Sequence, residues 1–82
     1  MQGAYSEAQQ VFERIVVLQP ENATAQQDLG YAALYANDSA TAIEAFKRFL
    51  ELAPDDPQAA AIRQQIKQLE ASSSGATASS SG

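Results

Sequence analysis

Apolar residues recur every three or four positions through most of the chain, which is the spacing of one face of an α-helix. Pro, Asn and Asp residues, which are typical of turns, interrupt this spacing at three places. The pattern therefore predicts an all-α fold of about four helices, over residues 4–19, 23–36, 39–52 and 57–70.

The three turns also carry residues that start helices. Asn22, Asp38 and Asp56 each precede a predicted helix, and their side-chain oxygens can accept hydrogen bonds from unpaired N–H groups of the first turn. Pro57 is then expected at the first helical position, where its missing N–H costs nothing. Asp55 and Asp56 are therefore interpreted as capping residues rather than as a metal site.

The apolar spacing also predicts which faces pack. The second helix carries mainly alanines around Leu29 and Gly30, and such small side chains let two helix axes approach closely. We therefore expect a tight helix pair around Gly30. The expected core residues of the first, third and last helices are Ala8, Phe12, Ile15 and Val16; Ala42, Ile43, Phe46, Phe49 and Leu50; and Ile62, Ile66 and Leu69.

The sequence also matches itself at an offset of 34 residues. The matches fall on expected core and turn positions, and a helix-turn-helix unit of this period is the signature of the tetratricopeptide repeat. Within residues 1–70 the identical pairs are Ala8 and Ala42, Phe12 and Phe46, Arg14 and Arg48, Leu18 and Leu52, Pro20 and Pro54, and Ala25 and Ala59.

Residues 23–56 resemble one complete repeat of the tetratricopeptide family. Gln26 and Ala33 depart from the family pattern, because they stand where the family has Trp and its second aromatic residue. Asn37 replaces the family's turn glycine, and Asn tolerates a left-handed backbone conformation. The matching residues are Leu29, Gly30, Ala42, Phe46 and Pro54 in this repeat, and Gly3, Tyr5, Ala8, Phe12 and Pro20 in the half-repeat before it.

The resemblance implies an antiparallel helix-turn-helix solenoid that winds as a right-handed superhelix. Residues 1–22 are then the second helix of a truncated repeat in a longer array, and 23–56 are the complete repeat. Residues 57–70 are expected to form a C-terminal capping helix with a polar outer face. In this helix the family's Leu, Gly and second aromatic positions hold Arg63, Gln64 and Lys67.

Residues 71–82 differ in composition from everything before them. They comprise six Ser, three Ala, two Gly and one Thr, without a charge or a large apolar side chain. Such a segment cannot bury enough apolar surface to offset its loss of conformational entropy. We therefore expect a disordered Ser/Gly-rich tail.

The composition excludes several classes of function. The 82 residues include no His, Cys or Trp, five Lys and Arg, and ten Asp and Glu, for a net charge of −5. Thiol nucleophiles, histidine bases and disulfides are therefore absent, and no catalytic residue, metal site or cofactor is predicted. The basic residues are scattered, so nucleic acid and anionic membranes are not expected partners. The compartment stays open.

The family resemblance implies a protein-protein interaction module, whose concave groove takes a peptide or a helix of a partner. Gln side chains can donate to and accept from an extended backbone, and Tyr offers flat apolar area. The alternative is that the large groove residues simply cover a core that is poor in large side chains. The expected groove residues are Thr24, Gln27, Tyr31, Leu34, Tyr35, Gln58 and Gln65, with Ala61 and Gln68 beside them.

A second possible function is assembly. In the truncated repeat the first helix lacks the helix that would cover its apolar side, and exposed apolar faces often pair with a copy of themselves. We therefore also expect self-association into a homodimer through Tyr5, Val11 and Val16.

Overall fold

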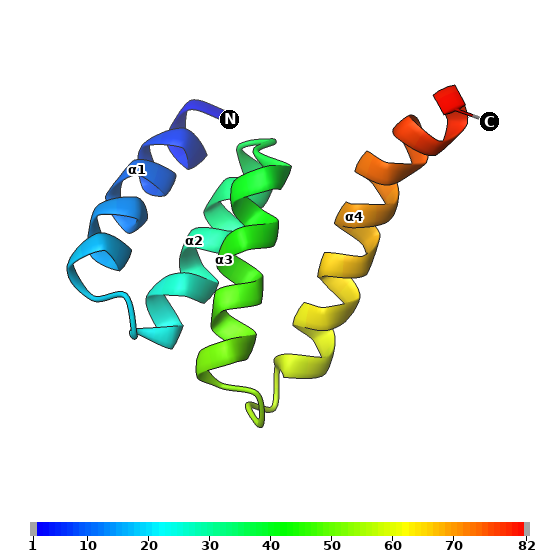
Figure 1. Cartoon of the computed structure of the whole chain (residues 1–82). Coiled ribbons are helices and arrows are strands. Elements are labelled where there is room, and N and C mark those ends of the chain that lie inside the picture. Colours follow the sequence, from blue (N-terminus) through cyan, green and yellow to red (C-terminus); the bar gives the residue numbers. More distant parts are fainter. Residues whose placement is uncertain (1, 82) are drawn as a thin grey trace.

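Four helices run alternately in opposite directions, and each packs against the next along the chain (Figure 1). The computed structural model describes the backbone of residues 2–81 and the side chains of residues 3–72. For these residues, the all-α fold predicted from the apolar spacing and the antiparallel helix-turn-helix arrangement implied by the family resemblance are both confirmed. The helices are α1 (Gln2–Leu18), α2 (Ala23–Tyr35), α3 (Ser39–Leu52) and α4 (Ala59–Ser81).

The starts of α2 and α3 have the predicted caps. Asn22 Oδ1 accepts a hydrogen bond from the N–H of Ala25 at 3.0 Å, and Asp38 Oδ1 accepts one from the N–H of Thr41 at 3.1 Å. Asn37 adopts a left-handed backbone with φ of 65°, as expected where it replaces glycine.

The start of α4 differs from the prediction. Asp56 Oδ1 accepts from the N–H of Gln58 at 2.8 Å, and the Asp56 carbonyl accepts from the N–H of Ala59 at 2.9 Å. Because these bonds close a turn over residues 57–58, Pro57 precedes the helix instead of occupying its first position. Helix boundaries commonly move by one or two residues in this way.

The end of α4 also differs from the prediction, since the helix continues past residue 70 to Ser81. Ala and Ser are compatible with a helix, and no proline interrupts this stretch. The side chains after residue 72 lie outside the described residues. Disorder of residues 71–82 therefore stays a prediction.

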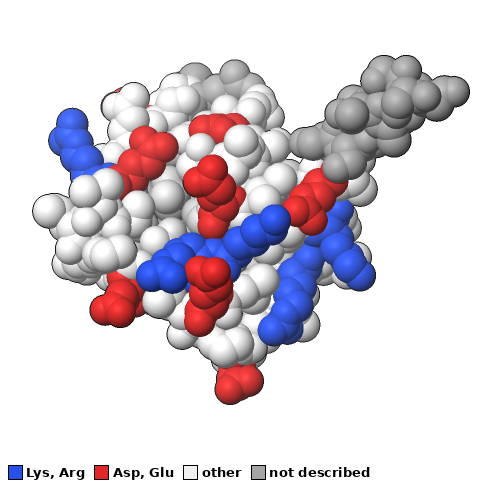
Figure 2. All heavy atoms as spheres, viewed as in Figure 1, with Lys and Arg blue, Asp and Glu red and all other residues white. Residues whose placement is uncertain are grey.

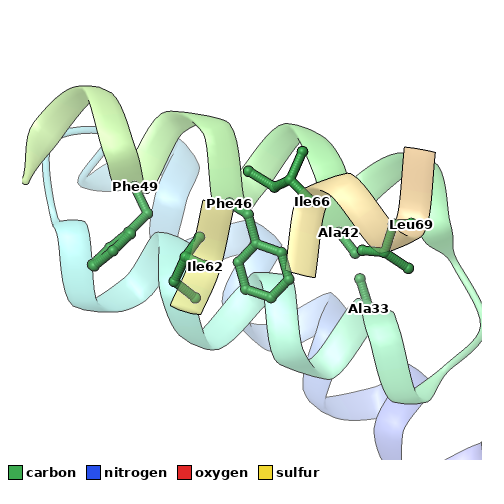
Figure 3. Close-up of a cluster of buried hydrophobic side chains, with 7 residues drawn as sticks. All are labelled: Ala33, Ala42, Phe46, Phe49, Ile62, Ile66 and Leu69. Atoms are coloured by element: carbon green, nitrogen blue, oxygen red, sulfur yellow. The ribbon is translucent and has the colours of Figure 1, made fainter. Parts of the chain in front are cut away.

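The core lies where α2, α3 and α4 meet (Figure 3). Phe46 and Ile62 are fully buried, and Phe49 is 2% exposed. The predicted stripe of α4 is buried as expected, whereas the stripe of α1 is only half-buried. The buried cluster comprises Ala33, Ala42, Phe46, Phe49, Ile62, Ile66 and Leu69.

The tight helix pair predicted around Gly30 is present. A Cβ atom on this residue would collide with the Phe46 ring, whose Cζ atom would lie 2.9 Å away. Gln26, at the family's Trp position, is also buried, and its Nε2 donates to the carbonyl of Pro20 at 3.3 Å. Small side chains on α2 and a bonded amide therefore replace the family's larger aromatic packing.

Asp38 links three segments of the chain. Besides capping α3, its Oδ2 accepts from Gln9 Nε2 of α1 at 2.7 Å and from the Thr41 hydroxyl at 2.7 Å. The Thr41 hydroxyl lowers the pKa of the Asp38 carboxyl most, followed by the Gln9 amide and the Thr41 N–H. These donors stabilise the ionised form.

We expect Asp38→Ala to lower the free energy of unfolding by about 1–2 kcal/mol at neutral pH, because α3 loses its cap. The pKa of Asp38 is lower in the folded than in the unfolded state, so the stabilisation from its ionised form is present above the unfolded value of about 3.9. It is lost as the pH falls below that value and through the folded pKa. The difference in the free energy of unfolding between wild type and Asp38→Ala should therefore be smaller in acid.

Urea unfolding at pH 7 and pH 3, followed by circular dichroism, measures this difference. Asp55→Ala is the matched control, because Asp55 is an exposed turn carboxylate. A difference of equal size at both pH values would show that the hydrogen bonds of the ionised Asp38 do not stabilise the fold.

Candidate functional site

The predicted groove residues lie on α2, on α4 and in the segment just before α4. Thr24 is exposed at the start of α2 and Gln65 is half-buried on α4. Between these helices, Gln27 Nε2 donates a hydrogen bond to Gln58 Oε1. The two amides therefore bind each other and link α2 to the segment before α4.

Two other predicted groove residues are partly used by the core. Tyr31 and Leu34 are half-buried and pack against the central apolar cluster. The Tyr31 ring meets Phe46 edge-on, with 5.1 Å between the ring centroids and 75° between the planes. These two side chains thus cover the core, as the alternative interpretation expects, although part of each remains accessible.

Tyr35 is different, because 55% of it is exposed at the end of α2. Its ring lies against Tyr5 of α1, with 5.1 Å between centroids and 38° between planes. Tyr5 is itself 41% exposed. The structure thus joins a residue predicted for self-association to one predicted for the groove.

An open depression of about 280 Å³ lies between α1 and α2 beside this tyrosine pair. Its walls are aromatic or methyl groups with one carboxylate, and we call it the tyrosine depression. Asp28 and Phe12 were not predicted for a site, although Asp28, Ala32 and Tyr35 follow the helical spacing of one face. The lining residues are Tyr5, Ala8, Phe12, Asp28, Tyr31, Ala32 and Tyr35.

The outer side of α1 carries a separate apolar surface. Val11 is 54% exposed, and Val17 and Leu18, which were not predicted for a site, are 77% and 80% exposed. Val17 and Leu18 line a shallow depression of about 500 Å³ together with polar residues of α1. Val16 is half-buried and instead borders a hollow between α1, α2 and α3.

Charges of both signs are interspersed on the face shown in Figure 2. Lys47 pairs with Glu70 at 2.9 Å, and Arg48 pairs with Glu51 at 3.0 Å, all of them well exposed to solvent. Within the described part of the chain, no group of three or more Asp and Glu side chains is placed to hold a metal ion. Helices 18 residues or longer and apolar enough to cross a membrane are likewise absent from the described residues.

Comparison with known proteins agrees with the repeat seen in the sequence. A family profile described as tetratricopeptide repeat matches residues 2–67, which cover α1, α2, α3 and the first part of α4. No curated protein and no solved structure gives a significant match to the chain.

Proposed function

Because the chain belongs to the tetratricopeptide repeat family, whose members generally serve as protein-protein interaction modules, we propose that it binds a peptide or helix of a protein partner at the tyrosine depression. The observation that carries this proposal is the meeting of Tyr5, Tyr31 and Tyr35 from two helices at an open depression. We propose a non-catalytic, scaffolding role, as is typical of the family.

Tyrosine suits such a surface for physical reasons. Its ring contributes a large apolar area, it has few rotatable bonds to immobilise, and its hydroxyl group remains available for a hydrogen bond. Tyr5 and Tyr35 already restrain each other by ring contact across the two helices. Part of the entropy cost of ordering these side chains is thus met before a partner binds.

The proposed surface continues from the depression along α2 toward α4. We assign Gln27, Gln58 and Gln65 to this continuation, since their amides can donate to and accept from the backbone of an extended peptide. In the free protein Gln27 and Gln58 bind each other, so a peptide would have to exchange that hydrogen bond for its own. The tyrosines are therefore the main binding residues of the proposal, and the glutamines are secondary.

A peptide selected from a random display library tests this proposal. The library is panned on the whole chain and depleted on a variant carrying both Tyr5→Ala and Tyr35→Ala. We expect selected peptides to bind the wild type with micromolar Kd, and Tyr35→Ala alone to weaken binding by about tenfold or more, as removing an aromatic hot spot does. Isothermal titration calorimetry measures both values.

Val17→Ala is the matched control, because Val17 is exposed on the outer side of α1 away from the depression. Its Kd should stay within about twofold of wild type. A library that yields no peptide sensitive to the tyrosine substitutions would contradict the proposed function.

Self-association through α1 is a second candidate, and the exposed apolar residues of α1 favour it. At the 34-residue offset Val11 corresponds to Ala45, which is 3% exposed, whereas Val11 is 54% exposed. Ile15 corresponds to Phe49, which is 2% exposed, whereas Ile15 is half-buried. The α1 face thus has the sequence of a packed face, and a copy of the chain could cover it.

We expect a weak dimer that is half-formed at about 100 μM, because only a few side chains are available to bury. Sedimentation equilibrium should show the mass rising from 8.7 kDa toward twice that value with concentration. Leu18→Lys should abolish the rise, and Tyr35→Ala should leave it unchanged. A constant mass of 8.7 kDa up to 1 mM would reject self-association.

A further inference from the structure

The tyrosine depression contains a carboxylate that packing does not require. At the 34-residue offset Asp28 corresponds to Ile62, which is fully buried in the core. Ala32 corresponds in the same way to Ile66, which is 6% exposed. Thus α4 fills the equivalent space with two branched aliphatic side chains, whereas α2 places there a charge and a methyl group. Because Asp28 and Ala32 stand where α4 has two isoleucines, a space is left beside α1 and a negative charge lies in it.

Among the residues that the structure describes, Asp28 has no cationic partner. None of the five Lys and Arg residues, all of which lie within the described side chains, forms an ion pair with it. The residue is nonetheless half-buried beside tyrosine rings. A carboxylate in such a position attracts a cation more strongly than a carboxylate in open water, because less solvent screens it.

The walls of the depression select the kind of cation. Tyrosine and phenylalanine rings attract positive charge to their faces, and arginine is the side chain that most often uses this attraction. The guanidinium group is planar, so it can stack on a ring, and it forms two parallel hydrogen bonds to a carboxylate. The ammonium group of lysine is compact and more strongly hydrated, so it would gain less binding free energy in this depression than a guanidinium group.

We infer that the tyrosine depression holds an arginine side chain of the partner peptide, with Asp28 as its counter-ion and the tyrosine rings as its walls. This inference rests on the proposed function and names the chemistry of the segment that is bound. Charge complementarity supports it, because the depression has one charged group, a carboxylate, and the whole chain has a net charge of −5.

Capped pentapeptides of four alanines with a central test residue provide the probe. The test residues are arginine, lysine and citrulline, the last being a neutral residue of nearly the same shape as arginine. NMR titration of the whole chain, followed through the tyrosine ring signals, gives each Kd. We expect the arginine peptide to bind about tenfold more tightly than the citrulline peptide, and the lysine peptide to lie between them.

Asp28→Asn should raise the Kd of the arginine peptide to that of the citrulline peptide. It should leave the Kd of the citrulline peptide within about twofold of the wild-type value. Asp55→Asn is the matched control, since it removes the same charge from an exposed turn, and it should change each Kd by less than about twofold. Circular dichroism verifies that both variants are folded.

Equal affinity for arginine and citrulline, an unchanged arginine Kd in Asp28→Asn, or no binding of the arginine peptide at 10 mM would each overturn the inference. The proposed function has its own criterion, which is the tyrosine sensitivity of a display-selected peptide. If a selected peptide no longer binds Tyr35→Ala but binds Asp28→Asn as tightly as wild type, the arginine site is rejected and the peptide-binding function stands.

Discussion

Gly30→Ala is expected to remove most of the free energy of unfolding, with a loss of about 3 kcal/mol. An added methyl group would collide with the ring of Phe46, which is fully buried. Alanine is the better helix former by about 1 kcal/mol, but this gain is smaller than the cost of overpacking. A single core of this size supplies only about 3–5 kcal/mol, so the variant should be largely unfolded at room temperature.

Urea unfolding followed by circular dichroism measures the effect, and Gly3→Ala supplies the control. Gly3 also lies in a helix, but apart from its chain neighbours and the backbone of its own helix, no described atom lies within 4 Å of the position that a Cβ would take. We expect this control to be as stable as wild type or more stable by up to about 1 kcal/mol. If Gly30→Ala is equally stable, then α2 and α3 do not pack as closely as described.

Phe46→Ala should cost about 3–5 kcal/mol, because it empties the centre of the cluster shared by α2, α3 and α4. The side chain is fully buried and also supports the ring of Tyr31 through their edge contact. Chemical denaturation should therefore find little folded protein even without urea.

Phe12→Ala is the informative comparison, because Phe12 is the residue equivalent to Phe46 at the 34-residue offset. It is half-buried and borders the open tyrosine depression. Since less apolar area is removed from water there, we expect a loss of only about 1–2 kcal/mol. Equal losses for the two variants would mean that the depression is closed in solution.

Features that depend on neighbouring residues could be predicted from the sequence. Asn22 and Asp38 cap the helices that follow them, and Asn37 has the left-handed backbone expected of it, because each depends on local backbone geometry. The tight helix pair around Gly30 followed from the small residues of α2, although the sequence did not identify Phe46 as the side chain packed against it. The predicted start of α4 was wrong, because several residues in the turn before this helix can either end or begin a helix.

Contacts between distant segments could not be predicted in the same way. Tyr5 was assigned to the self-association face and Tyr35 to the groove. The two rings meet because α1 and α2 run antiparallel, which places the start of α1 beside the end of α2. The exposure of Val17 and Leu18 was also missed, since an apolar residue in a helical pattern does not reveal whether another helix covers it. Asp28 could have been noticed, because the 34-residue offset aligns this charged residue with Ile62, which is fully buried.

We propose that a partner peptide binds at the tyrosine depression and not on the outer side of α1, which is the candidate face for self-association. NMR chemical-shift mapping with a display-selected peptide and isotope-labelled chain tests it most directly. We expect the largest shifts on Tyr5, Tyr31 and Tyr35 and on the α2 backbone around Asp28. Largest shifts at Val17 and Leu18, with the tyrosine signals unmoved, would contradict it.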